Sequence, residues 1–136
     1  MPGHNTRASL LVSGTQRSIF WIWVLSVLLI VYGSLSPDMH MDTQMQDSDK
    51  VLHFAAYTWL ALAARMSCVP ASKSAGLAVY LLAMGCVLEL IQSVIPGRFF
   101  SLFDIGANAV GVGLGLVLAT LIAHKGPRFL APLIKE

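Results

Sequence analysis

The sequence is poor in charged residues and in cysteine. Only 12% of its 136 residues are charged, about half of what a soluble domain carries, whereas 56% are hydrophobic and the mean hydropathy is +0.71. Cys68 and Cys86 both lie in or beside apolar runs, which argues against a disulfide framework and a cysteine-based zinc site. The hydrophobic fraction excludes disorder. These values predict a small integral membrane protein with one domain.

Four apolar runs are long enough to cross a membrane as helices, which takes about 17–25 residues. A proline follows each run within a few residues, where a helix ends. An open sheet would leave backbone groups unpaired in lipid. We therefore predict an all-α integral membrane four-helix bundle, with spans at residues 19–35, 51–69, 74–95 and 102–123.

The positive charges predict the orientation of these spans. Seven of the nine Lys and Arg residues lie in the two tails and the second connection, and only Lys50 and Arg98 lie in the first and third connections. Cytoplasmic segments carry the excess of Lys and Arg, so both termini are expected to be cytoplasmic. The predicted parts are a polar cytoplasmic tail (1–18), a membrane domain (19–123) and a short basic cytoplasmic tail (124–136). The basic residues are not clustered, so no nucleic acid is expected to bind.

Several polar residues interrupt the apolar pattern of the third and fourth spans. Glu89 lies within the third span and shares a helix face with Gln92 at i+3. Asp104 and Asn108 share a face at the start of the fourth span. An ionisable side chain within a span is costly and by default indicates function, although a neutral Glu that links two helices is a structural alternative. Ser101-x-x-Asp104 is typical of a capping box, which explains Asp104 but not Asn108.

The second span carries Asp49, His53 and Tyr57 along one face, at i, i+4 and i+8. An acidic residue there is typical of a helix N-cap, and a lone His is more often structural than catalytic. Arg65 lies near the opposite end of this span, and we expect its side chain to reach the membrane surface. In the fourth span, Gly111 and Gly115 form a small-xxx-small pattern that lets another backbone approach closely.

The predicted orientation brings the polar positions of three spans and one connection to the same outer third of the membrane. We therefore predict one site there, open to the outer leaflet or the periplasmic side. A pair of ionisable groups suits acid–base work, and Lys and Arg suit an anionic ligand. The expected catalytic residues are His53, Glu89 and Asp104, and the expected substrate-binding residues are Lys50, Gln92, Arg98 and Asn108.

The order of these motifs resembles the VanZ-like family of small bacterial membrane proteins. The resemblance covers about residues 49–115 and rests on Asp49-Lys50, His53, Tyr57, Glu89-x-x-Gln92, Pro96-Gly97-Arg98 and Asp104-x-x-x-Asn108-x-x-Gly111-x-x-x-Gly115. It implies a multi-pass protein of the bacterial cytoplasmic (inner) membrane that acts in cell-envelope biology. The founding member of the family is associated with low-level resistance to the glycopeptide teicoplanin. Some relatives carry phosphotransbutyrylase labels, which this sequence does not support because it lacks a phosphate-cradling glycine loop.

These observations favour binding or modification of an envelope lipid with an anionic head group. No serine near the site has the spacing of a nucleophile elbow or a catalytic triad, so whether the protein is an enzyme stays open. A small proton-coupled transporter and a non-enzymatic accessory subunit are the alternatives. His53, Glu89 and Asp104 are ligand types that suit zinc or manganese, but no HExxH-like spacing supports a metal. No metal ligand and no cofactor is therefore assigned.

Overall fold

The computed structural model describes residues 3–36, 46–67, 69–96 and 98–125. Within these ranges all regular structure is helical, and no strand occurs. The prediction of an all-α four-helix protein is therefore confirmed. The helices are α1 (Gly3–Leu35), α2 (Gln46–Ser67), α3 (Ser74–Gln92) and α4 (Leu102–Lys125), with the short 3-10 helix η2 (Ala71–Lys73) before α3.

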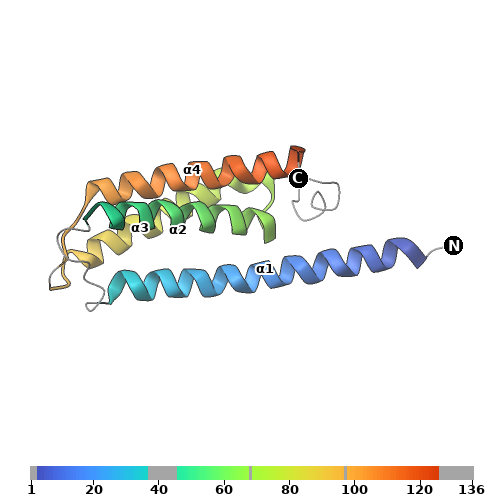
Figure 1. Cartoon of the computed structure of the whole chain (residues 1–136), viewed down its shortest axis with the longest axis horizontal. Helices are drawn as coiled ribbons and strands as arrows, with labels where there is room; N and C mark the ends of the chain where they lie inside the picture. Colours follow the sequence, from blue (N-terminus) through green and yellow to red (C-terminus); the bar gives the residue numbers. More distant parts are fainter. Residues whose placement is uncertain (1–2, 37–45, 68, 97, 126–136) are drawn as a thin grey trace.

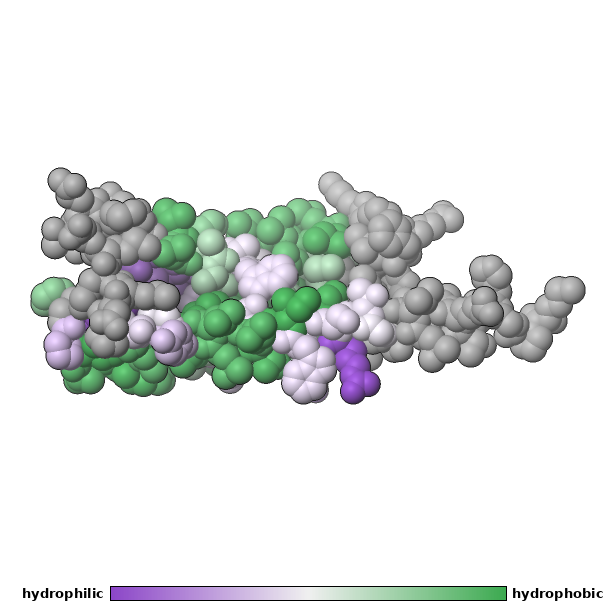
Figure 2. All heavy atoms as spheres, turned by 60° about the horizontal axis from the view of Figure 1, so that its bottom comes forward, coloured by the Kyte–Doolittle hydropathy of each residue, from purple (hydrophilic) through white to green (hydrophobic). Residues whose placement is uncertain are grey.

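In the described part of the chain, three stretches are long and apolar enough to cross a membrane: Gly14–Leu35, Ala71–Gln92 and Leu102–His124. They lie in α1, in η2 with α3, and in α4. Helix α2 is more polar, since it includes Asp49, Lys50 and Arg65. Its passage across the membrane and the cytoplasmic position of both termini stay predictions. Figure 2 shows a band of hydrophobic side chains along the middle of one face, with hydrophilic side chains nearer its ends.

Helices α2, α3 and α4 lie together, and α1 runs along one side of them (Figure 1). Helix α1 is longer than its apolar run, because it begins at Gly3, and its N-terminal part extends beyond the other helices. At the opposite end of the molecule, α1 and α3 end while α2 and α4 begin. We call this the site end of the bundle.

The closest helix pair is α2 with α4, and two glycines make the approach possible. A Cβ atom at Gly111 would lie 2.5 Å from the carbonyl oxygen of Phe54. A Cβ atom at Gly115 would overlap the carbonyl oxygen of Thr58 and lie 2.8 Å from Cβ of Ala61. The close approach predicted from the small-xxx-small pattern is therefore confirmed.

Two tryptophan side chains attach α1 to α2. The indole N–H of Trp23 donates to the carbonyl oxygen of Leu60 at 3.0 Å. The indole N–H of Trp59 donates to the hydroxyl of Ser26 at 2.9 Å. Each bond gives a partner to a polar atom that would otherwise face apolar surroundings.

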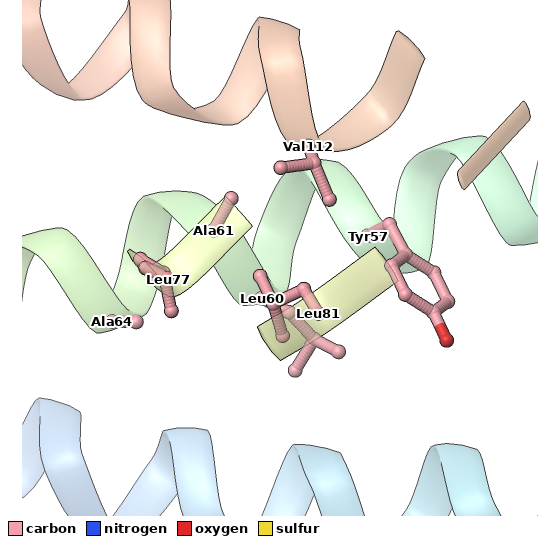
Figure 3. Packing of buried hydrophobic residues seen from close by; sticks show 7 residues of the cluster. All are labelled: Tyr57, Leu60, Ala61, Ala64, Leu77, Leu81 and Val112. Carbon is pink, nitrogen blue, oxygen red and sulfur yellow. The ribbon is translucent and has the colours of Figure 1, made fainter. Parts of the chain in front are cut away.

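The apolar core is built from α2, α3 and α4 and extends from Tyr57 toward the end of the bundle opposite the site. Figure 3 shows Tyr57 at one end of this core, with its hydroxyl pointing away from the other members. The buried members come from three helices, so they hold these helices in register. They are Tyr57, Leu60, Ala61, Ala64, Leu77, Leu81 and Val112.

Gly115→Ala is expected to lower the free energy of unfolding by about 1–3 kcal/mol, because the added methyl group would collide with the backbone of α2. Unfolding of the purified protein in detergent micelles measures this difference. Gly113→Ala is the matched control, since a Cβ atom at Gly113 has nothing within 4 Å. That change should leave stability unchanged or raise it by up to about 1 kcal/mol. Equal effects of the two substitutions would contradict the packing described here.

Candidate functional site

Five polar side chains come together at the site end. We call Asp49, His53, Glu89, Asp104 and Asn108 the polar cluster; the first two lie on α2, the third on α3 and the last two on α4. The α3 and α4 members are at most 7% exposed. Buried polar groups need partners from the protein, from water or from a ligand. The contacts within the cluster therefore decide what it can bind.

His53 connects α2 to α4. Its ring atom Nδ1 lies 3.1 Å from Oδ1 of Asn108, and because an amide oxygen only accepts, Nδ1 donates. Its other ring nitrogen, Nε2, lies 3.8 Å from Oδ1 of Asp49, one helical turn earlier. The hydrogen bond to Asn108 thus orients the imidazole ring, with Nε2 on the side of Asp49.

Asp104, in the first turn of α4, lies close to Asp49 and His53 of α2, and the three side chains are all potential metal ligands. One oxygen or nitrogen atom from each of Asp49, His53 and Asp104 lies within 4.8 Å of the other two. The backbone N–H of Asp104 donates to the hydroxyl of Ser101 at 3.2 Å, so the capping contact predicted from the sequence is confirmed. In a capping box the Asp104 side chain would in turn accept the backbone N–H of Ser101, but here another residue accepts it.

Glu89 of α3 accepts the backbone N–H of Ser101 in place of Asp104. Its Oε2 accepts the backbone N–H of Ser101 at 3.0 Å, which is the contact that a capping box would give to Asp104. The Asp104 carboxylate can therefore face the cluster. The second oxygen of Glu89, Oε1, is buried without a partner among the described residues. The Glu89 carboxylate interacts electrostatically with His53, Asp49 and Asp104.

Two further buried polar atoms lie against α3 without partners in the described part of the chain. They are the hydroxyl of Tyr57 and Nδ2 of Asn108. A Cβ atom at Gly85 would lie 3.0 Å from the first and 2.8 Å from the second, so glycine makes room for both. Sequence reasoning placed Tyr57 on the face of His53 but gave it no role. The i, i+4, i+8 spacing was the signal that could have included it.

Gln92 and Arg98 contact the end of α1. Nε2 of Gln92 donates to the carbonyl oxygen of Ser34 at 2.9 Å. Nη2 of Arg98 donates to the carbonyl oxygens of Gly33 at 3.2 Å and Ser36 at 3.4 Å. The last carbonyls of a helix lack partners within it, so these side chains fix α1 to the site end. Both were predicted to bind a substrate, and this tethering role was not foreseen.

Lys50 also belongs to the site end. Its Nζ lies 5.7 Å from the ring centroid of Phe103 in the first turn of α4, which is a cation–π distance. Lys50 therefore brings a positive charge from the start of α2 to the start of α4.

Arg65 lies away from the polar cluster, in the last turn of α2, and its position relative to the membrane surface stays a prediction. The residue is only 3% exposed. Its Nη1 donates to the carbonyl oxygen of Val69, just past the end of α2. The side chain thus folds back over the helix terminus, where a cation and the free carbonyls attract each other.

The polar cluster offers proton carriers and cation ligands. His53 and the three carboxyl groups can exchange protons or hold a cation. The nearby serines are already engaged, since the Ser93 hydroxyl donates to the carbonyl oxygen of Leu90 at 2.7 Å and that of Ser101 caps α4. Among the described residues neither serine forms a nucleophile–base pair of the kind that activates a hydroxyl.

Comparison with models of known protein families finds a match over most of the chain. A family model described as VanZ/LLP1 matches residues 5–123. The matched stretch includes all four helices almost completely and every member of the polar cluster. Neither a curated protein nor a solved structure matches the chain.

Ser101→Ala is expected to lower the free energy of unfolding by about 1 kcal/mol, because it removes an N-cap side chain from α4. Thermal unfolding in micelles measures the change. Ser93→Ala is the matched control: it removes an exposed hydroxyl that bonds only within its own helix, and should change stability by less than about 0.5 kcal/mol. An equal loss in both variants would show that Ser101 does not cap α4.

Proposed function

This chain belongs to the VanZ/LLP1 family, and from that premise we propose that its polar cluster, together with Arg98 and Lys50, binds or modifies an anionic lipid of the cell envelope. The lipid head group would lie among the polar side chains at the site end. Its acyl or prenyl chains would lie along the apolar surface of the helices.

The environment of the Arg98 guanidinium is the main support for an anionic ligand. Its guanidinium is half-buried, and among the described residues no carboxylate lies within ion-pair distance of it. Nη2 donates to the carbonyl oxygens of Gly33 in α1 and of Ser36 just past its end, while Nε is buried without a described partner. A partly buried cation with no counter-charge among the described residues attracts an anion, and the guanidinium fork suits phosphate oxygens.

The surroundings of Arg98 also fit an amphipathic ligand. Lys50 supplies a second positive charge, held over Phe103. Phe99 is 86% exposed and Phe103 is 77% exposed, so large apolar side chains adjoin the charged groups. A lipid head group with its attached chains matches this combination better than a small soluble anion does.

His53, Glu89 and Asp104 are the proposed catalytic residues if the lipid is modified. His53 is oriented by Asn108, and Glu89 has one buried oxygen without a described partner. An oriented imidazole beside a carboxyl group can deliver or remove a proton at a bound head group. Nδ2 of Asn108 is available to orient that head group.

The apolar core favours lipid binding over proton-coupled transport. The core begins at Tyr57, which shares the space beside Gly85 with Asn108. It continues through Leu60 and Leu81 toward the opposite end of the bundle. A transporter needs ionisable groups that both faces of the membrane can reach, and packed aliphatic side chains block such a path. We further propose that the site faces the outer side of the bacterial cytoplasmic membrane, where lipid binding would affect susceptibility to glycopeptides such as teicoplanin.

Native mass spectrometry of the gently solubilised protein tests the proposal. We expect wild type to retain a phospholipid or a polyprenyl phosphate, and Arg98→Gln to lose most of it. Removing a charge-assisted hydrogen bond to a ligand costs about 1.5–3 kcal/mol, which corresponds to a loss in affinity of about 10-fold to 150-fold.

Arg17→Gln is the matched control, because it removes the same charge from an exposed position on α1, far along the helix from the site end. It should retain the lipid. Bare protein in all variants would contradict lipid binding and favour the accessory-subunit alternative. Equal retention by wild type and Arg98→Gln would show that Arg98 does not hold the head group.

A further inference from the structure

The polar cluster contains three potential metal ligands that the sequence does not bring together in one local motif. Atoms of Asp49, His53 and Asp104 lie within 4.8 Å of one another. Sequence reasoning considered Glu89 in place of Asp49, but Glu89 is not part of this close group. The structure therefore replaces Glu89 by Asp49 in the set of potential metal ligands.

The hydrogen bond to Asn108 prepares His53 to bind a cation. Because Nδ1 donates to the amide oxygen of Asn108, the neutral ring carries its proton on Nδ1 and a lone pair on Nε2. Nε2 is the atom on the side of Asp49. A second hydrogen bond that fixes the ring tautomer in this way is typical of metal-binding histidines.

The cluster also has an excess of acceptors. Three carboxyl groups, those of Asp49, Glu89 and Asp104, interact with one another and with a single histidine. Glu89 is 1% exposed, and its Oε1 has no partner in the described part of the chain. Buried carboxylates are unfavourable without a positive partner, and a cation would provide one.

We propose that Asp49, His53 and Asp104 bind one divalent metal ion. One imidazole with two carboxylates suits Zn²⁺ or Mn²⁺ rather than a soft metal that prefers thiolates. Metal–ligand bonds of about 2.0–2.2 Å require ligand atoms up to 4.8 Å apart to move closer together. Asp49 can make this movement, since its side chain is 41% exposed. Glu89 lies outside the close group, where its free oxygen can accept a hydrogen bond from a metal-bound water.

This inference goes beyond the proposed function and does not rest on it. Metal binding depends on Asp49, His53 and Asp104 and does not involve Arg98, whereas the proposed lipid binding requires Arg98. If both occur, the open coordination positions of the metal would accept oxygens of the lipid phosphate.

The test measures metal binding by the full-length protein in lipid-free detergent micelles, after a chelator has been added and removed. We expect wild type to bind one Zn²⁺ per chain by mass spectrometry of the metal content, and Co²⁺ as a spectroscopic substitute to give ligand-field absorption bands. His53→Gln and Asp104→Asn should abolish the bands. Asn108→Leu should weaken binding by about 10-fold to 100-fold, because it removes the group that orients His53.

His124→Gln is the matched control, since His124 is exposed near the far end of α4, and it should bind metal as wild type does. A helical circular dichroism spectrum equal to wild type shows that each variant is folded. If wild type binds none of Zn²⁺, Mn²⁺ and Co²⁺, the proposal is overturned. Unchanged binding by folded His53→Gln would also overturn it, because the metal would then lie elsewhere. Arg98→Gln should bind the metal normally, which separates this result from the outcome for the lipid.

Discussion

The close approach of α2 to α4 is the constraint on which the rest of the structure depends. Gly111 and Gly115 let the two backbones touch, and this contact places His53 within hydrogen-bond distance of Asn108 one turn nearer the site end. Side chains at these two glycines would separate the helices and pull that pair apart. The site therefore depends on the two glycines as much as on the polar residues that form it.

Helix α3 and the end of α1 complete the site from the other side. Glu89 accepts the first free N–H of α4, so α3 and α4 are joined at the same level as α2 and α4. Gln92 and Arg98 hold the last carbonyls of α1. These bonds satisfy helix termini that would otherwise be exposed to an apolar environment. The polar residues at this end thus stabilise the bundle and also leave acceptors and a cation available for ligands.

Much of this arrangement was predictable from the sequence, because long apolar runs and polar interruptions have strong physical signatures. The four helices, the glycine contact and the capping by Ser101 all follow from local spacing. Local spacing could not predict which side chains on different helices contact each other. Asp49 rather than Glu89 joins His53 and Asp104, and Gln92 binds α1, because these pairings depend on the relative rotation and height of packed helices. The bond from Arg65 to the carbonyl oxygen of Val69 was also not predictable, because the long side chain can reach several acceptors.

The central claim is that α2, α3 and α4 form one coupled site. A double-mutant cycle between His53→Gln and Glu89→Gln, measured as the free energy of unfolding in metal-free micelles, tests it most directly. The account predicts that the double mutant departs from the sum of the single mutants by more than about 0.5 kcal/mol, whereas His53→Gln combined with Thr120→Val, at the far end of α4, should be additive. Additivity within about 0.3 kcal/mol for His53 and Glu89 would contradict a single site.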